Sequence, residues 1–260
     1  MEVTKNTLKE IKAYNQEKDK FYLLNLISET VGSLLSSDNS TYIIGRSKVG
    51  LPTWIWTLDD IEKVNLESLE KDLQNYLEPG ENKITCKKEL YNLLKEKYKT
   101  SNYFEMGYLS CRELIKPSKL NGVFVRPNYG DKISLSRLWI ANNKEMENVD
   151  ISESEALETV DEWLENKNFY VLKDETGKIV SMAGYSTVEN QAKITHVFTP
   201  KEERQKGYCK SLIYCLTKLL LEKELVPLLY TDYHYKPSNE AYKKVGYEPQ
   251  GYLVNFKIKK

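Results

Sequence analysis

The sequence predicts a mixed α/β protein whose second half joins an antiparallel meander to a βαβ crossover. The turn sequence Glu-Thr-Gly-Lys at 175–178 separates two apolar runs, at 169–174 and 179–188, which is typical of a β-hairpin. Residues 208–223 repeat apolar side chains at helical spacing, and another apolar run follows at 226–231. A hairpin followed by a helix and a further strand indicates a sheet with a helical crossover.

The remaining elements of the second half complete this layout. Gly246 follows a short helical pattern and is a good residue to end a helix. The resulting order is β-α-α-β-β-β-α-β-α-β. We expect strands at 122–127, 169–174, 179–188, 192–199, 226–231 and 252–258, and helices at 135–142, 155–165, 208–223 and 239–244.

The first half shows a similar alternation of helices and strands. Apolar residues recur at helical spacing over 4–35, which predicts one long or broken helix before a polar break at 36–40. We expect strands at 42–46, 53–57, 82–86 and within 103–114, and helices at 66–77 and 88–98. Pro117 and Ser118 suit a boundary, so the predicted domains are residues 1–118 and 119–260.

Charge and cysteine usage exclude several classes of protein. The chain has 260 residues, with 38 Lys plus Arg against 38 Asp plus Glu, so no global attraction to nucleic acid or anionic membranes is expected. No apolar run is long enough for a membrane span, and the N-terminus is too charged for a secretion signal. Four cysteines without a C-x-x-C pair and only two histidines argue against a metal centre and favour the cytoplasm.

The stretch 192–212, AKITHVFTPKEERQKGYCKSL, has the pattern of an anion site. A predicted strand ends at Thr199, and a charged loop then leads into the long helix. The first N–H groups of a helix lack internal partners and carry positive potential, which suits a pyrophosphate. Gly207 allows a close approach of the backbone, and Arg204, Lys206 and Lys210 add positive charge.

The string R-Q-K-G-Y-C at 204–209 resembles the R/Q-x-x-G-x-G/A signature of the GNAT superfamily of CoA-dependent N-acyltransferases. Cys209 departs from the usual Gly or Ala, although it is also small. A second match follows in the order that the superfamily shows. Asn239, Tyr242, Gly246 and Tyr247 resemble its Asn, its tyrosine on a short helix, and its closing Gly-Tyr. The resemblance covers residues 121–260.

The resemblance implies a GNAT-like fold, acetyl-CoA as acyl donor and no metal. It also implies a splayed gap between the strands at 192–199 and 226–231, where the pantetheine arm would lie, and a role for Tyr242 as proton donor to the departing sulfur. The cofactor-binding residues that it implies are Val197, Phe198, Thr199, Arg204, Gln205, Lys206, Gly207, Tyr208, Cys209, Lys210 and Asn239.

The function that follows is transfer of an acetyl group to a primary amine of a small molecule or amino acid by direct attack. The general base stays open. Lys193, Thr195 and His196 lie on the strand before the loop and Glu189 lies just upstream, but a buried strand residue is an equally good interpretation of His196. Strand alternation places His196 and Val197 on opposite faces. Water could equally take the proton.

Two further questions stay open at this stage. Without an obvious carboxylate base, a non-catalytic acyl-CoA sensor is the alternative function. Asp232 and His234 follow the strand at 226–231 and could line the acceptor site or be solvated loop residues. The first half lacks the glycine signature, so it is either a degenerate GNAT-like repeat or an unrelated α/β extension.

Overall fold

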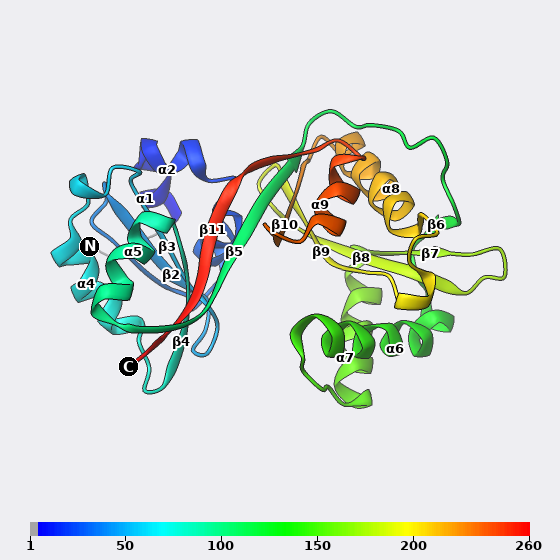
Figure 1. Ribbon diagram of the computed structural model, residues 1–260, viewed down its shortest axis with the longest axis horizontal. Helices are drawn as coiled ribbons and strands as arrows, with labels where there is room; N and C mark the ends of the chain where they lie inside the picture. The colour runs from blue at the N-terminus through cyan, green and yellow to red at the C-terminus, as the bar shows by residue number, and fades with distance from the viewer. Residues whose placement is uncertain (1–4) are drawn as a thin grey trace. The chain divides into compact units, whose positions relative to one another are not determined.

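The computed structural model describes residues 5–260, and these form two compact units (Figure 1). The first unit consists of the chain up to Tyr108 together with residues 230–235 and 250–260. The second unit consists of residues 109–229 and 236–249. Each unit therefore contains segments that are distant in sequence, and the strands β5, β10 and β11 begin in one unit and end in the other.

The helices and strands of the first unit follow the predictions closely. The helical pattern over 4–35 is a broken helix, as one of its two interpretations required; Thr4, its first residue, lies outside the described residues. The polar break hides a short strand, β1, which sequence reasoning missed because its serines lack an apolar alternation. The elements are α1 (Lys5–Glu10), α2 (Lys12–Glu17), α3 (Tyr22–Glu29), β1 (Leu34–Ser37), β2 (Tyr42–Arg46), β3 (Thr53–Thr57), α4 (Leu66–Leu73), β4 (Glu81–Cys86), α5 (Lys88–Lys97) and β5 (Lys99–Cys111).

The sheet of the first unit has the strand order β1-β2-β3-β4-β11-β5. The strands β1, β2 and β3 pair antiparallel, whereas β3 and β4 pair parallel because α4 carries the chain across. The last strand of the chain, β11 (Tyr247–Lys259), pairs antiparallel with β4, and Phe256 lies opposite Ile84. The C-terminal strand therefore completes the sheet of the first unit.

Alternation along β2 explains why helices cover both faces of this sheet. Tyr42 and Ile44 belong to a core with residues of α4 and α5, whereas Ile43 belongs to a second core with residues of α1 and α3. Successive side chains of a strand point to opposite faces, so a strand buried along its whole length needs a layer on each side. The first unit is thus a helix–sheet–helix sandwich.

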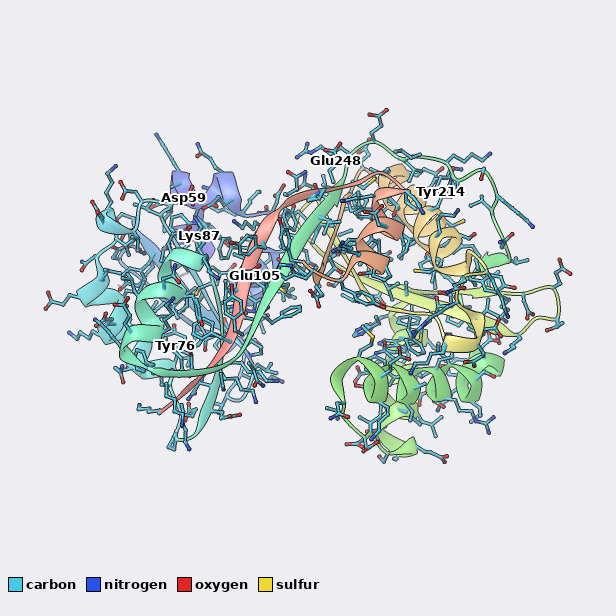
Figure 2. All side chains as sticks on the ribbon, viewed as in Figure 1. Asp59, Tyr76, Lys87, Glu105, Tyr214 and Glu248 are labelled. Atoms are coloured by element: carbon cyan, nitrogen blue, oxygen red, sulfur yellow. The ribbon has the colours of Figure 1, made fainter. Side chains whose placement is uncertain are left out.

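One lysine of the first unit is buried as part of an ion cluster. Lys87 has a side chain that is 3% exposed, and its Nζ lies 2.6 Å from an oxygen of Asp59 (Figure 2). It also pairs with Glu17, which in turn accepts a hydrogen bond from the Trp56 indole at 2.8 Å. A buried charge is costly unless it is paired, so this cluster fixes α2 to the end of β4.

The second unit has the predicted order of elements, with ends that differ by a few residues. Its helix α9 begins three residues earlier than predicted, and β11 is five residues longer at its start. The elements are β6 (Val123–Val125), α6 (Lys132–Asn142), α7 (Glu153–Asn166), β7 (Phe169–Lys173), β8 (Ile179–Val188), β9 (Gln191–Phe198), α8 (Tyr208–Glu222), β10 (Val226–Asp232) and α9 (Lys236–Lys243).

The sheet of the second unit has the order β10-β9-β8-β7-β6. The neighbours from β6 to β9 are antiparallel, and β9 pairs parallel with β10 after the crossover through α8. Apolar residues of α8, including Leu212, Leu216 and Leu220, form a core on one face of this sheet. Leu135 of α6 and Val160 of α7 form another core with Phe169 and Phe198 on the other face.

Both units therefore repeat one arrangement. In each, helices precede three antiparallel strands, and a helical crossover then leads to a parallel strand, a further helix and a long strand. The predicted mixed α/β fold is confirmed. The predicted division at residue 118 stays a prediction, since the compact units divide the chain at Tyr108 and interleave its segments. In the described part of the chain, no helix is long and apolar enough to cross a membrane.

Candidate active site

The strand β9 carries a β-bulge just before its end. The register with β8 steps from Met182–Phe198 to Gly184–Thr195, so β9 has one more residue than β8 over this interval. His196 lies in the bulge with a φ of 53°. Regular alternation would place Ile194 and Val197 on opposite faces, but both pack against the core beneath α8. The bulge was not predicted, because no glycine marks it.

His196 faces the opposite side of the sheet from Val197, as predicted. The centroid of its ring lies 4.9 Å from that of Trp139 and 5.4 Å from that of Trp163. Although part of the ring reaches the surface, desolvation by its surroundings, and next the charge of Lys193, lowers the pKa of His196 to about 4. Burial also lowers the pKa of Lys193, to about 8. At neutral pH the imidazole is therefore uncharged and weakly basic.

We expect the variant His196→Asn to reduce the acid sensitivity of the fold. The pKa of His196 lies below its ordinary value of 6.5, so its stabilising effect is complete above pH 6.5 and is lost as the pH falls toward 4. Asparagine does not titrate and tolerates a positive φ. Urea unfolding at pH 7 and pH 5 should show a smaller loss of unfolding free energy in the variant. An equal loss in both proteins would contradict the low pKa.

The parallel ladder between β9 and β10 is short. It joins Gln191–Lys193 to Val226–Leu228 and, in the described chain, does not continue toward the bulge. A bulge increases the local twist of a strand and disrupts its pairing. The end of this ladder agrees with the separation of the two strands that the resemblance implied.

The loop after β9 ends at an uncapped helix N-terminus. Gln205 has a φ of 63° and Gly207 a φ of 80°, so the loop turns twice through the left-handed region before α8 begins. Gly207 is the N-cap of α8, and no side chain accepts a hydrogen bond from the first turn. The first N–H groups of this 15-residue helix are therefore not taken up by a side-chain cap. An anion suits such a site.

The basic side chains of the loop have carboxylate partners. Arg204 donates to Glu145 at 2.6 Å and to the carbonyl of Thr199 at 2.8 Å. Lys206 pairs at 2.8 Å with Glu203, whose other oxygen binds Lys178. The positive charge that the sequence predicted here is therefore largely offset. The i,i+3 spacing of Glu203 and Lys206 could have revealed one pair, but Glu145 is 59 residues away and gave no signal.

The end of β9 is fixed from below. The hydroxyl of Ser181 on β8 donates to the carbonyl of Phe198 at 3.1 Å and lies 2.8 Å from the Thr199 hydroxyl. Thr199 is 9% exposed, so these bonds are largely shielded from water. Ser181 was not predicted, yet it holds the last residues of the strand before the loop.

Two residues of the second predicted motif belong to α9. Tyr242 is 8% exposed, and its ring centroid lies 6.0 Å from that of Tyr247. Burial, and next the neighbouring Cys209, raises the pKa of Tyr242 well above its ordinary value. Burial also raises the pKa of Cys209, to about 11, so this thiol is protonated at neutral pH. Asn239 lies one turn before Tyr242 on the same helix and is half-buried.

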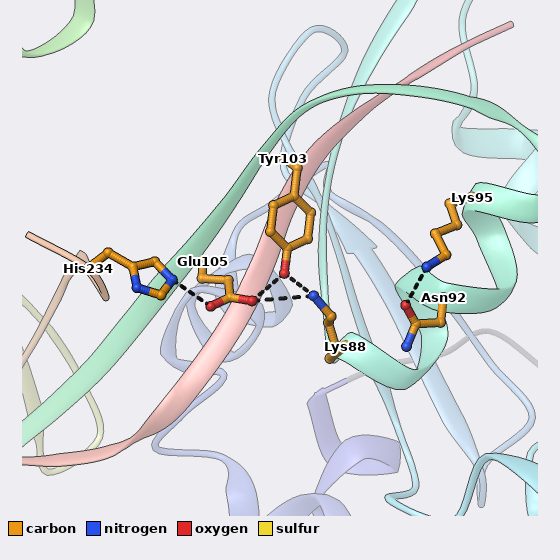
Figure 3. Close-up of polar contacts among 6 residues, drawn as sticks. All are labelled: Lys88, Asn92, Lys95, Tyr103, Glu105 and His234. Carbon is orange, nitrogen blue, oxygen red and sulfur yellow. Dashed lines mark hydrogen bonds and ion pairs between the residues drawn. The ribbon is translucent and has the colours of Figure 1, made fainter.

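The remaining sequence candidates lie away from this loop. Glu189 occupies the turn before β9, whereas the loop follows the end of β9. His234 belongs to the first unit, where its Nε2 lies 2.8 Å from Glu105 (Figure 3). Glu105 also binds Lys88 at 3.3 Å and accepts a hydrogen bond from the Tyr103 hydroxyl. Among residues 5–260, no group of three or more acidic, His or Cys side chains could hold a metal ion.

Solved structures with the same fold cover nearly the whole chain. At these identities the likeness establishes the fold, which is that of GNAT acetyltransferases. A GNAT-family acetyltransferase from Colwellia psychrerythraea is 12% identical, with a TM-score of 0.65, and the match covers 98% of this chain and 94% of that one. A GCN5-related N-acetyltransferase from Sphaerobacter thermophilus is 9% identical, with a TM-score of 0.62 and coverage of 96% and 91%. A tandem GNAT protein from the clavulanic acid biosynthesis pathway is 9% identical, with a TM-score of 0.55 and coverage of 88% and 83%.

The sequence itself matches one family. Residues 136–247 match the model of the acetyltransferase (GNAT) family, and this stretch runs from α6 to Tyr247. The second unit therefore carries a GNAT acetyltransferase domain, as its two motifs predicted. The match supports acetyl transfer that depends on an acyl-CoA. No curated protein is significantly similar to the chain in sequence.

Proposed function

We propose that the second unit transfers the acetyl group of acetyl-CoA to a primary amine of a small molecule or amino acid. The observation that carries this proposal is the uncapped N-terminus of α8 at Gly207, directly after the bulged strand β9. The helix offers N–H donors to a pyrophosphate, and the bulged strand offers backbone groups to the amides of a pantetheine arm. The family match at 136–247 supports the same chemistry.

In this proposal the cofactor lies along the residues that the sequence predicted. Val197, Phe198 and Thr199 would bind the pantetheine arm through their backbone, and Asn239 would contribute from α9. The pyrophosphate would be held by the backbone of Arg204 to Cys209, with Lys210 one turn into the helix. Because Arg204 and Lys206 already have carboxylate partners, main-chain donors would supply most of the attraction.

Tyr242 is the proposed proton donor to the departing sulfur. Direct attack forms the bond between the amine nitrogen and the acetyl carbon, and it breaks the bond from that carbon to sulfur. The thiolate then takes a proton. The raised pKa of Tyr242 keeps its hydroxyl protonated at neutral pH, as a donor requires. Its nearness to Cys209 places it beside the first turn of α8.

The proton of the attacking amine needs a separate acceptor. A general base works best when its pKa lies near the working pH, so His196, with a pKa of about 4, suits this role poorly. The pKa of Lys193, about 8, lies closer to neutrality. We propose that bulk or bound water carries this proton, since no carboxylate lies on β9.

We further propose that the first unit is a degenerate repeat that has lost the cofactor site. Its crossover helix α4 corresponds in order to α8, but α4 is capped by Asn65, which accepts a hydrogen bond from the N–H of Ser68 at 3.2 Å. Asp59 and Asp60 lie in the preceding segment, which contains no glycine. A capped N-terminus beside carboxylates repels an anion, so a pyrophosphate would not bind there.

The test is turnover of acetyl-CoA by the full chain with a panel of primary amines. We expect release of free thiol that depends on a particular amine, together with a product heavier by one acetyl group. Calorimetry with CoA alone separates the alternatives. Binding of CoA without acetylation of any amine would favour the acyl-CoA sensor, to which the weakly basic His196 also points. Absence of CoA binding would overturn both functions.

A further inference from the structure

Asn121 joins the segment before β6 to the loop that precedes α8. Its side-chain Nδ2 donates to the main-chain carbonyl of Lys206 at 2.6 Å. Its main-chain N–H donates to the hydroxyl of Ser211 at 2.9 Å. Ser211 is buried in the first turn of α8, and its own N–H bonds to the carbonyl of Gly207 at 3.0 Å. One residue therefore holds both the loop and the helix that follows it.

The bond to Lys206 sets the direction of the next N–H group. A peptide unit is planar and trans, so the carbonyl of Lys206 and the N–H of Gly207 point in opposite directions. Asn121 draws this carbonyl toward itself, which turns the N–H of Gly207 to the other side. The positive φ of Gly207 is part of the same turn. A Cβ on Gly207 would lie 3.1 Å from Nδ2 of Asn121, so the two residues are in close contact.

The other contacts of the loop involve side chains. Glu145 binds the Arg204 guanidinium, and Glu203 binds the Lys206 ammonium. Such contacts hold the ends of long side chains, and they leave the orientation of the peptide between Lys206 and Gly207 to other groups. Asn121 acts on that peptide directly.

We propose that Asn121 is a positioning residue for the CoA pyrophosphate, which aims the Gly207 N–H at the anion by holding the carbonyl of Lys206. This inference rests on the proposed function of the second unit. Asn121 touches no reacting atom, so its effect falls on cofactor binding rather than on the transfer step.

The variant Asn121→Leu removes the side-chain donor and keeps the approximate size and the main-chain N–H. Loss of one such bond and of a preset donor should raise the Kd for CoA about five- to tenfold. The KM for acetyl-CoA should rise in parallel, while kcat at saturation stays within about twofold. S-acetylpantetheine lacks the pyrophosphate, so variant and wild type should use it at equal kcat/KM.

Asn168→Leu is the matched control. Asn168 also donates from Nδ2 to a carbonyl of the second unit, that of Tyr185, at 2.7 Å, but it lies on the far side of β7 from the loop in sequence. It should lower the melting temperature by a similar amount and leave the Kd for CoA unchanged. Asn121→Asp, which keeps the shape and loses the donor, serves as a second variant should the leucine variant fold poorly.

The outcomes separate the two levels of the argument. If wild type binds CoA and both Asn121 variants, once folded, bind it equally well, the positioning role is wrong while the proposed function stands. If kcat/KM falls as much with S-acetylpantetheine as with acetyl-CoA, Asn121 supports the fold in general and the inference is also wrong. If wild type does not bind CoA, the proposed function fails and this inference fails with it.

Discussion

The variant Gly207→Asp is expected to weaken CoA binding by at least about a hundredfold. Its carboxylate would lie at the N-terminus of α8, where the pyrophosphate is proposed to bind, and would repel that anion and compete for its N–H donors. Hydrogen bonds to charged groups are worth about 1.5–3 kcal/mol each, so loss of two accounts for this factor. Calorimetry with CoA measures it directly.

Two control variants separate the causes of this effect. Gly207→Asn adds a side chain of the same size without charge, so it should weaken binding less than Gly207→Asp. Gly50→Asp places the same residue on a glycine of nearly the same φ, 82°, in the first unit, where an added Cβ meets nothing within 4 Å. It should leave the Kd for CoA unchanged. A folded Gly207→Asp protein with wild-type affinity would exclude the loop as the pyrophosphate site.

The variant Tyr242→Phe is expected to lower kcat about a hundredfold and to leave the Kd for acetyl-CoA nearly unchanged. General acid catalysis contributes about a hundred- to ten-thousand-fold, and a thiolate is a tolerable leaving group even without a donor, so the low end applies. The ring fills the buried space that it shares with Tyr247, and phenylalanine keeps that packing. Steady-state turnover with the best amine of the panel measures kcat.

Tyr247→Phe is the matched control for this prediction. The Tyr247 hydroxyl lies 2.8 Å from that of Thr217 in the same core, so its loss should cost stability without slowing the transfer. Wild-type turnover in Tyr242→Phe would make Tyr242 a structural residue. A joint loss of affinity and melting temperature would point to a packing role instead.

The physical character of the loop follows from its ion pairs. Arg204 and Lys206 lie beside the proposed anion, yet each is held by a carboxylate. Exposed ion pairs contribute little to stability, but they fix where long side chains lie. The attraction for a pyrophosphate would then come mainly from main-chain donors, and residues that orient peptides, such as Asn121, gain importance over residues that merely carry charge.

The sequence by itself determined the order of the elements and the position of the main motif. Helical spacing over 208–223 and alternation over 179–188 gave α8 and β8 to within a residue, because amphipathic periodicity is a local property. Gly207 was recognised as the start of α8 for the same reason, since a glycine between a charged loop and an apolar helix has few other roles. The fold class followed from this order.

Only the tertiary structure decided the features that depend on partners distant in sequence. The bulge at His196 arises from the register between β8 and β9, and no residue type announces it. The pairing of β11 with β4 brings the end of the chain into the first unit, which no cut at residue 118 anticipates. Asn121 and Glu145 reach the loop from 85 and 59 residues away. Hydrogen bonds and ion pairs of this kind depend on where the sheet places its strands, so a local reading of the sequence cannot supply them.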